Sequence, residues 1–288
     1  MILIDGKKIA DRIKDEIVAE ILAANNGNIH ADARPHLAIV LVGVRPDSEL
    51  YVSLKEREAK KVGVDTTLYR LPEDAHEAEL EEVINFLNND SGTDAILLQL
   101  PLPDHMNADK IIALMNPKKD VDGFHPENLA KINCTGSEIF VPPLGQVVLE
   151  ILEEAKIDPA GLQAVVIANS DVFGETLGKI LQQRGAKVEI SSPDDKDLAD
   201  KISEADILVS AAGVPGLIKG EQIKKNVCII DVGITKTADG KIKGDADAES
   251  VKDKAGYLTP VPGGVGPITI ATALANTVKI WKKNKKTE

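Results

Sequence analysis

The sequence has few cysteines, no long hydrophobic run and no excess of positive charge. Its two cysteines, Cys134 and Cys228, are far apart in the chain, which argues against a disulfide framework or a zinc knuckle. No apolar run is long enough to span a membrane, and the first residues lack the basic and then apolar pattern of a secretory signal. A net charge of −12, from 46 acidic and 34 basic residues, argues against a general nucleic-acid surface. We therefore expect a cytoplasmic protein that binds neither a membrane nor a nucleic acid.

The first half of the chain alternates apolar runs with helical patterns, which is typical of an α/β domain. Leu37 to Val42 is a continuous apolar run of strand length, and isoleucines at every fourth position from Ile9 to Ile21 mark the buried stripe of a helix. A chain of 288 residues, 43% of them hydrophobic, is long enough for two domains. The predicted strands of this half cover residues 37–42, 66–70 and 94–98, and its predicted helices cover residues 9–21, 48–63, 76–87 and 107–115.

The second half has the pattern of a Rossmann-like, dinucleotide-binding fold. A strand, a helix and a further strand follow one another between residues 163 and 191, which makes a βαβ unit. Its first turn keeps one glycine of the Gly-x-Gly-x-x-Gly fingerprint, because Ala168 and Ser170 replace two glycines and Gly174 is the third. Two more buried strands are predicted within residues 205–215 and 227–234, and a last helix over residues 268–281.

Tyr51 and Lys55 lie four residues apart, so on a helix they share one face. The predicted helix begins at Ser48, interpreted as its cap, and places Lys55 just beyond the carboxyl end of the strand 37–42. Ligands bind at this edge of open parallel sheets. A desolvated lysine there can lose its proton near neutral pH and act as a general acid or base. On its own, the pair is more typical of a solvated helix edge with an extended lysine than of a catalytic site.

Two later segments present polar side chains at the ends of predicted elements. Gln99 directly follows the strand 94–98, and Pro101 and Pro103 hold the chain extended after it. Asp120 and Asp122 lie in a turn rich in carboxylates. They could bind a metal by type, but one acidic pair without further oxygen ligands is poor evidence, and we expect no metal.

The loop before the last helix, residues 260–267, reads Pro-Val-Pro-Gly-Gly-Val-Gly-Pro. Prolines make such a loop rigid, and glycines let its backbone approach a planar ligand closely. A purely structural turn would rarely need all of them.

Together these motifs resemble the bifunctional methylenetetrahydrofolate dehydrogenase/methenyltetrahydrofolate cyclohydrolase family, known in bacteria as FolD. The resemblance extends through nearly the whole chain and rests on several ordered motifs. They are Ile4-Asp5-Gly6-Lys7, Val42-Gly43 with Ser48, Tyr51-Val52-x-x-Lys55, Gln99-Leu100-Pro101-Leu102-Pro103, Lys119-Asp120-Val121-Asp122-Gly123-Phe124, Ile230-Asp231-Val232-Gly233-Ile234 and Pro260 to Pro267.

The resemblance implies two α/β domains facing across a cleft. A folate-binding catalytic domain over residues 1–142 would be completed by the C-terminal helix, residues 267–288, and a Rossmann-like domain would cover residues 143–266. The family oxidises 5,10-methylenetetrahydrofolate to the methenyl compound with NADP or NAD, and then hydrolyses that compound to 10-formyltetrahydrofolate. Family members are homodimers that pair through the nucleotide domain.

The resemblance also implies a role for each motif residue. The lysine matching Lys55 is the general acid/base of the hydrolytic step, Gln99 helps to tune it, Tyr51 packs along the pterin and Asp122 anchors the pterin ring through adjacent N–H donors. Lys55 takes a proton from water if neutral, or gives one to the departing nitrogen if charged; the sequence leaves both open. The substrate positions implied are Tyr51, Val52, Lys55, Leu98, Gln99, Leu100, Asp122, Pro262, Gly263 and Gly264. The cofactor positions implied are Ala168, Asn169, Ser170, Gly174, Pro193, Ala212, Gly213, Ile234 and Thr269.

The chain departs from the family mainly at the dinucleotide site. Asn169 stands where an arginine usually meets the 2′-phosphate of NADP, and an amide cannot pair with a dianion as arginine does. After the next strand, Pro193, Asp194 and Asp195 stand near a usual His-Ser pair. Their carboxylates would repel a 2′-phosphate but accept hydrogen bonds from an unmodified ribose. We therefore expect a shift toward NAD or a weakened site.

Three smaller departures accompany this change. Thr176 replaces a usual proline, Glu49 replaces a usual glutamine, and Phe140-Val141-Pro142-Pro143 replaces a Pro-Cys-Thr-Pro segment.

The sequence is also compatible with other functions. A cyclohydrolase with a degenerate dinucleotide site would retain Lys55 and its partners, while a noncatalytic folate-binding protein would have no use for them. A dehydrogenase acting on an amino acid or a shikimate-like substrate would share the fold, but it gives no reason for the loop 260–267.

Overall fold

The computed structural model describes residues 1–27, 33–132, 141–237 and 240–285 and divides the chain into two compact α/β units. The three-stranded unit comprises residues 11–143 and 270–288, and the six-stranded unit comprises residues 1–10 and 144–269. This division differs from the expected domains at the N-terminus. The first ten residues lie in the six-stranded unit because β1 (Ile2–Leu3) pairs in parallel with β11 (Tyr257–Leu258).

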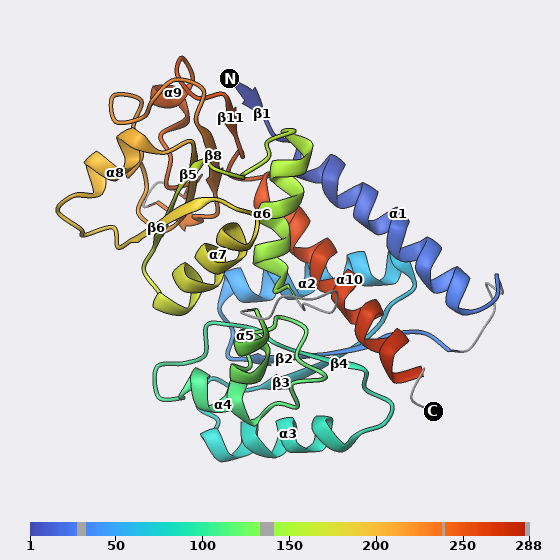
Figure 1. Ribbon diagram of the computed structural model, residues 1–288. Coiled ribbons are helices and arrows are strands. Elements are labelled where there is room, and N and C mark those ends of the chain that lie inside the picture. The colour runs from blue at the N-terminus through green and yellow to red at the C-terminus, as the bar shows by residue number, and fades with distance from the viewer. Residues whose placement is uncertain (28–32, 133–140, 238–239, 286–288) are drawn as a thin grey trace. The chain divides into compact units, whose positions relative to one another are not determined.

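The three-stranded unit is built on a parallel sheet with the order β3-β2-β4. Its strands are β2 (His36–Val42), β3 (Asp65–Leu71) and β4 (Ala95–Leu98). The central strand β2 is buried almost throughout, as expected for a strand covered on both faces. Figure 1 shows α3 (Glu77–Asn89) and α4 (Ala108–Leu114) on one side of this sheet and α2 (Pro46–Val62) on the other.

Helix α2 begins two residues earlier than the sequence suggested. Arg45 is its N-cap and Pro46 occupies the first turn, where a missing N–H costs nothing. The expectation that Ser48 caps the helix is therefore wrong, and Ser48 is a buried residue of the first turn instead. Gly63 ends the helix in the left-handed conformation, with φ of 81°, and its N–H bonds the Ala59 carbonyl oxygen.

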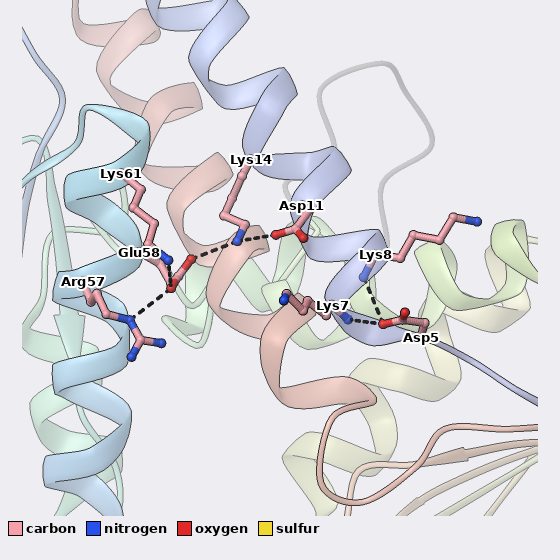
Figure 2. A network of polar contacts seen from close by, with 8 residues as sticks. All are labelled: Asp5, Lys7, Lys8, Asp11, Lys14, Arg57, Glu58 and Lys61. Carbon is pink, nitrogen blue, oxygen red and sulfur yellow. Dashed lines mark hydrogen bonds and ion pairs between the residues drawn. The ribbon is translucent and has the colours of Figure 1, made fainter.

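A partly buried ion-pair network joins α2 to α1 (Gly6–Ala24) (Figure 2). Glu58 accepts hydrogen bonds from Lys14 of α1 at 2.9 Å and from Lys61 at 2.8 Å. Lys14 also pairs with Asp11 at 2.6 Å, and only 18% of the Lys14 side chain and 13% of the Glu58 side chain are exposed. The network fixes the helix that carries Tyr51 and Lys55.

The six-stranded unit has an all-parallel sheet with the order β1-β11-β8-β7-β5-β6. Its longer strands are β5 (Gln163–Ala168), β6 (Lys187–Ser191), β7 (Ile207–Ala211) and β8 (Cys228–Asp231). The βαβ unit β5-α7-β6, with α7 over Asp171–Gln183, has the predicted order. Gly174 and Gly178 let α7 lie close to Ile190, because a side-chain carbon at either glycine would come within about 3 Å of that isoleucine.

The remaining elements are short or pass from one unit to the other. They are α5 (Pro126–Lys131), α6 (Pro143–Glu154), α8 (Leu198–Glu204), α9 (Ala248–Val251), the antiparallel pair β9 (Thr235–Lys236) and β10 (Ile242–Lys243), and α10 (Val265–Lys285). Helix α10 contributes its residues up to Thr269 to the six-stranded unit and the rest to the three-stranded unit.

Glu58→Gln tests the network that fixes α2. Burial alone would raise the pKa of Glu58, but the hydrogen bonds and charges of Lys14 and Lys61 outweigh it and lower that pKa to about 2. A carboxyl whose pKa is depressed in the folded state adds stability above its unfolded pKa and loses it as the pH falls through its folded pKa. We expect the variant to lower the free energy of unfolding by about 1–2 kcal/mol at pH 7 and by a smaller amount near pH 3, within the range between the two pKa values.

Urea unfolding of both proteins at the two pH values measures this difference. Glu16→Gln is the matched control, because Glu16 pairs with Arg12 at 3.3 Å on the exposed side of α1. An equal loss of stability in the two variants, or a loss independent of pH, would contradict the account.

Candidate active site

Lys55 and Gln99 meet at the carboxyl ends of neighbouring parallel strands. Lys55 lies on α2, which follows β2, and Gln99 directly follows β4. The Gln99 N–H donates to the Val40 carbonyl oxygen at 2.9 Å, which extends the ladder by one residue and fixes the start of the side chain. Lys55 Nζ donates a hydrogen bond of 2.8 Å to Gln99 Oε1, and Gln99 Nε2 donates one of 2.8 Å to the Leu100 carbonyl oxygen. The second bond holds the amide with its oxygen toward the lysine.

Asp122 is the charged group that acts on Lys55. Burial lowers the pKa of Lys55 below its ordinary value, and the charge of Asp122 opposes that shift. Burial raises the pKa of Asp122 to about 6, the charge of Lys55 opposes the rise, and Asp120 adds to it. Both side chains are half-buried and thus keep a surface that a ligand can reach. Burial therefore shifts the pKa of each group toward neutral pH, which suits proton exchange with a ligand.

Asp120 shapes the turn that presents Asp122. Its buried carboxylate accepts hydrogen bonds from the Gly123 N–H at 2.9 Å, the His125 N–H at 2.8 Å and Asn128 Nδ2 at 3.0 Å. The preceding chain is anchored to the sheet, because the Val121 N–H bonds the Ile96 carbonyl oxygen of β4 at 3.2 Å. Asp120 therefore has a positioning role, which the sequence did not reveal.

Asn276 of α10 is a second residue that the sequence did not single out. It is buried, and its Nδ2 donates a hydrogen bond of 3.3 Å to the Val121 carbonyl oxygen, one residue before Asp122. An asparagine in a mostly apolar stretch of the helix was the signal available in the sequence, but it does not identify its partner 155 residues away.

The other expected substrate residues of this unit differ in accessibility. Tyr51 and Leu100 are half-buried, and burial, with a contribution from Asp47, raises the pKa of Tyr51. Val52 and Leu98 are only 1% and 4% exposed, so their side chains pack in the core beneath the site. Among the residues that the structure describes, no group of three or more histidine, cysteine, aspartate or glutamate side chains could hold a metal ion.

The expected cofactor residues of the six-stranded unit gather at one edge of its sheet. The register pairs Ala168 of β5 with Ala211 of β7, so the turn after β5 lies beside the loop that contains Ala212 and Gly213. Asn169 Nδ2 donates a hydrogen bond of 3.1 Å to the Ala212 carbonyl oxygen and joins the two loops. Pro193 follows β6 and Ile234 follows β8 at the same edge, where parallel sheets bind ligands.

One of the two carboxylates in the loop after β6, that of Asp195, is engaged by neighbouring residues of the same unit. Asp195 accepts hydrogen bonds from Ser191 Oγ at 2.7 Å and from the Ser192 N–H at 3.1 Å, and Lys201 Nζ lies 3.5 Å from it. The hydrogen bond from Ser191, followed by the other contacts, lowers the pKa of Asp195. Asp194 is exposed.

The loop 260–264 packs against the start of α1, within the six-stranded unit. A side-chain carbon at Gly6 would overlap the Gly264 carbonyl oxygen, and one at Gly264 would come within 2.7 Å of the Pro260 carbonyl oxygen. Close backbone packing therefore requires glycine at both positions. Pro262 and Gly263 are exposed, and Thr269 lies half-buried on α10.

Comparison with known proteins identifies the family. The model of the tetrahydrofolate dehydrogenase/cyclohydrolase catalytic domain matches residues 4–122, and that of the NAD(P)-binding domain of the same family matches residues 142–285. A relative from Nitratiruptor sp., named bifunctional protein FolD, is 42% identical over 288 residues, covering 99% of this chain and 100% of the relative. The chain belongs to the FolD family.

Solved structures of FolD enzymes share the whole fold. The bifunctional enzyme FolD of Campylobacter jejuni is 38% identical with a TM-score of 0.92, over 98% of this chain and 99% of that one. The Trypanosoma brucei enzyme, solved with NADP cofactor and an inhibitor, is 32% identical with a TM-score of 0.92, over 99% and 98% of the two chains.

Family membership confirms several expectations from the sequence. The chain is an α/β protein with a parallel Rossmann-like sheet, and it is a FolD-type dehydrogenase and cyclohydrolase with an NAD(P)-binding domain. No helix among the described residues is long and apolar enough to cross a membrane. Cys134 and Phe140 lie outside the described residues, and Cys228 is a buried thiol whose pKa burial raises to about 12.

Proposed function

We propose that the protein oxidises 5,10-methylenetetrahydrofolate to 5,10-methenyltetrahydrofolate and then hydrolyses it to 10-formyltetrahydrofolate. The observation that carries this proposal is the 2.8 Å hydrogen bond from the half-buried Lys55 amino group to Gln99, with the charge of Asp122 opposing the effect of burial on the Lys55 pKa. A lysine desolvated in this way suits proton transfer during hydrolysis of a methenyl substrate.

Each residue has a distinct task in the proposed hydrolytic step. In its neutral form, which burial favours by lowering its pKa, Lys55 takes a proton from the water that attacks the methenyl carbon. It then returns that proton to the ring nitrogen that departs when the carbon–nitrogen bond breaks. Gln99 Oε1 holds the Lys55 nitrogen in place. Asp122 accepts hydrogen bonds from adjacent N–H groups of the pterin. These bonds favour the ionised carboxylate and so oppose the rise in pKa that burial causes. Tyr51 packs along the pterin ring.

The oxidative step uses the six-stranded unit. The oxidation needs a hydride acceptor, and a nicotinamide dinucleotide held by this unit would supply that chemistry. The carboxyl edge of the parallel sheet fits such a ligand: Gly174 allows the close packing of α7 on β6, and the loops after β5, β7 and β8 share one edge. These loops bind and orient the dinucleotide.

Lys55→Met separates the proposed chemistry from folding. We expect hydrolysis of preformed methenyltetrahydrofolate to fall by about 100-fold or more, because proton transfer by a placed side chain contributes on that order. The measurement is the decay of methenyl absorbance in purified protein, with Lys60→Met, an exposed lysine on the same helix, as control. Unchanged hydrolysis in Lys55→Met would refute the role of Lys55.

Hydrolysis without any oxidation in the unmodified protein would favour a cyclohydrolase with a degenerate dinucleotide site.

The preferred dinucleotide in this proposal is NAD rather than NADP. Asn169 supplies no positive charge for a 2′-phosphate, and its amide already bonds the Ala212 carbonyl oxygen. Asp194 is exposed at the end of β6, where an acidic side chain accepts a ribose hydroxyl. Asp195 contributes less than its sequence position suggested, because Lys201 and Ser191 engage its carboxylate.

The double variant Asn169→Arg/Asp194→Ser tests this preference. We expect the unmodified protein to oxidise the methylene substrate with NAD at a higher kcat/KM than with NADP. The double variant should shift the ratio toward NADP by about tenfold or more, because it adds a charge-assisted contact and removes a repulsive one. Glu189→Gln, a carboxylate on β6 that bonds Gln163, is the control and should leave the ratio unchanged. A clear NADP preference in the unmodified protein would overturn the NAD proposal and leave the enzyme assignment intact.

The proposed assembly is a homodimer that pairs through the six-stranded unit, in the cytoplasm. Support for the interface comes from β6, which lies at the edge of the sheet and carries Ile190 with 43% of its surface exposed.

A further inference from the structure

Two buried carboxylates, Asp231 and Asp245, lie at the dinucleotide edge of the six-stranded sheet. Asp231 is the last residue of β8 and is 2% exposed, and Asp245 follows β10 and is 0% exposed. Neither has a task in the chemistry described above. Burying two neighbouring acidic groups is costly, and burial, together with the charge of Asp245, raises the pKa of Asp231 to about 6 against the effect of its backbone hydrogen bonds. Such a cost is commonly retained where a site needs a fixed geometry.

Asp245 determines the shape of the loop after β7. Its Oδ2 accepts hydrogen bonds from Ser210 Oγ at 2.7 Å and the Ala212 N–H at 2.8 Å, and its Oδ1 accepts one from the Val214 N–H at 2.8 Å. Gly213, between the two bonded N–H groups, has a φ of +68°, a conformation that suits glycine. One carboxylate thus holds both sides of the Ala212–Gly213 turn.

Asp231 in turn fixes Asp245 and the loop after β8. Its carboxylate accepts hydrogen bonds from the Asp245 N–H at 3.0 Å, the Ala246 N–H at 2.8 Å and the Gly233 N–H at 3.0 Å. Its own N–H donates to Thr259 Oγ1 at 2.7 Å. Side-chain carbons at Gly233 or Gly244 would overlap the carboxylates of Asp245 and Asp231 respectively, so the two carboxylates also account for those glycines.

We infer that Asp245, supported by Asp231, is a positioning residue for the dinucleotide. This inference rests on the proposed function, because Ala212, Gly213 and Ile234 are cofactor positions only if that function holds. The carboxylate presents the turn after β7 in the conformation that receives the cofactor, and the same network holds Gly233 beside Ile234. Asp245 affects dinucleotide binding and oxidation through these loops, while the hydrolytic residues lie in the three-stranded unit.

Asp245→Asn and Ser210→Ala test the inference, with NADH as the probe. Asparagine replaces one of the two acceptor oxygens with a donor that faces a backbone N–H. We expect the Kd of NADH, from its fluorescence, and the KM for NAD to rise about tenfold or more, with hydrolysis of preformed methenyltetrahydrofolate unchanged within about twofold. Ser210→Ala removes one donor and should raise the Kd about threefold.

Asp206→Asn is the matched control. Asp206 lies at the opposite, amino end of β7 and holds the Gln163 N–H at 2.9 Å and Lys224 at 2.6 Å. Its substitution removes a carboxylate from the same sheet and should leave NADH binding unchanged.

The possible results separate the inference from the proposed function. Unchanged NADH binding in a folded Asp245→Asn, or an equal rise in Asp206→Asn, would overturn the inference. If thermal unfolding shows that Asp245→Asn does not fold, Ser210→Ala decides, and an unchanged Kd there would overturn it as well. Unmodified protein that binds NADH but does not oxidise the methylene substrate would instead refute the oxidative function. If the unmodified protein binds no dinucleotide, both the inference about Asp245 and the proposed oxidative function are wrong.

Discussion

The three-stranded unit depends on holding an ammonium group in a half-buried position at the end of a parallel sheet. Burial penalises the charge of Lys55, and the Gln99 amide and the Asp122 carboxylate offset part of that cost. The surrounding helix and strands hold these three side chains in position. Helix α2 starts at Pro46, shortly after the end of β2, and Gln99 extends β4 by one residue. Asp122 follows a segment whose backbone is hydrogen-bonded to Ile96 of β4. A shift in any of these would change the proton affinity of the lysine.

Both units use the same device to shape a binding loop. Asp120 in one unit and Asp245 in the other are buried carboxylates, each of which accepts three hydrogen bonds from N–H or O–H groups of the surrounding chain. Three donors offset the cost of burying a carboxylate and fix several residues of a loop at once. Each buried carboxylate lies beside a residue proposed to contact a ligand. Asp120 is two positions before Asp122, and Asp245 bonds the N–H groups on either side of Gly213.

Much of the site was predictable because its residues lie in short sequence motifs. Tyr51 and Lys55 share a helix turn, and Gln99 is marked by the prolines that follow it. The roles of Asp120, Asn276 and Asp245 were not predictable, because their partners lie elsewhere in the chain: Asp245 bonds Ser210 across 35 positions, and Asn276 bonds Val121 across 155. Strands β1 and β11 have two residues each, too few for an alternating pattern, so the place of the first ten residues was missed. Ser48 was mistaken for a cap because Pro46 provides the start of the helix without one.

The central claim is that Lys55 has a lowered pKa that Asp122 partly restores. Nitrogen NMR of the lysine side chains across a pH titration measures this directly, with the Lys55 signal identified by its absence in Lys55→Met. The account predicts that Lys55 titrates below the other lysines, and that Asp122→Asn lowers its pKa further because the opposing charge is gone. A Lys55 that titrates with the exposed lysines, or that does not respond to Asp122→Asn, would contradict it.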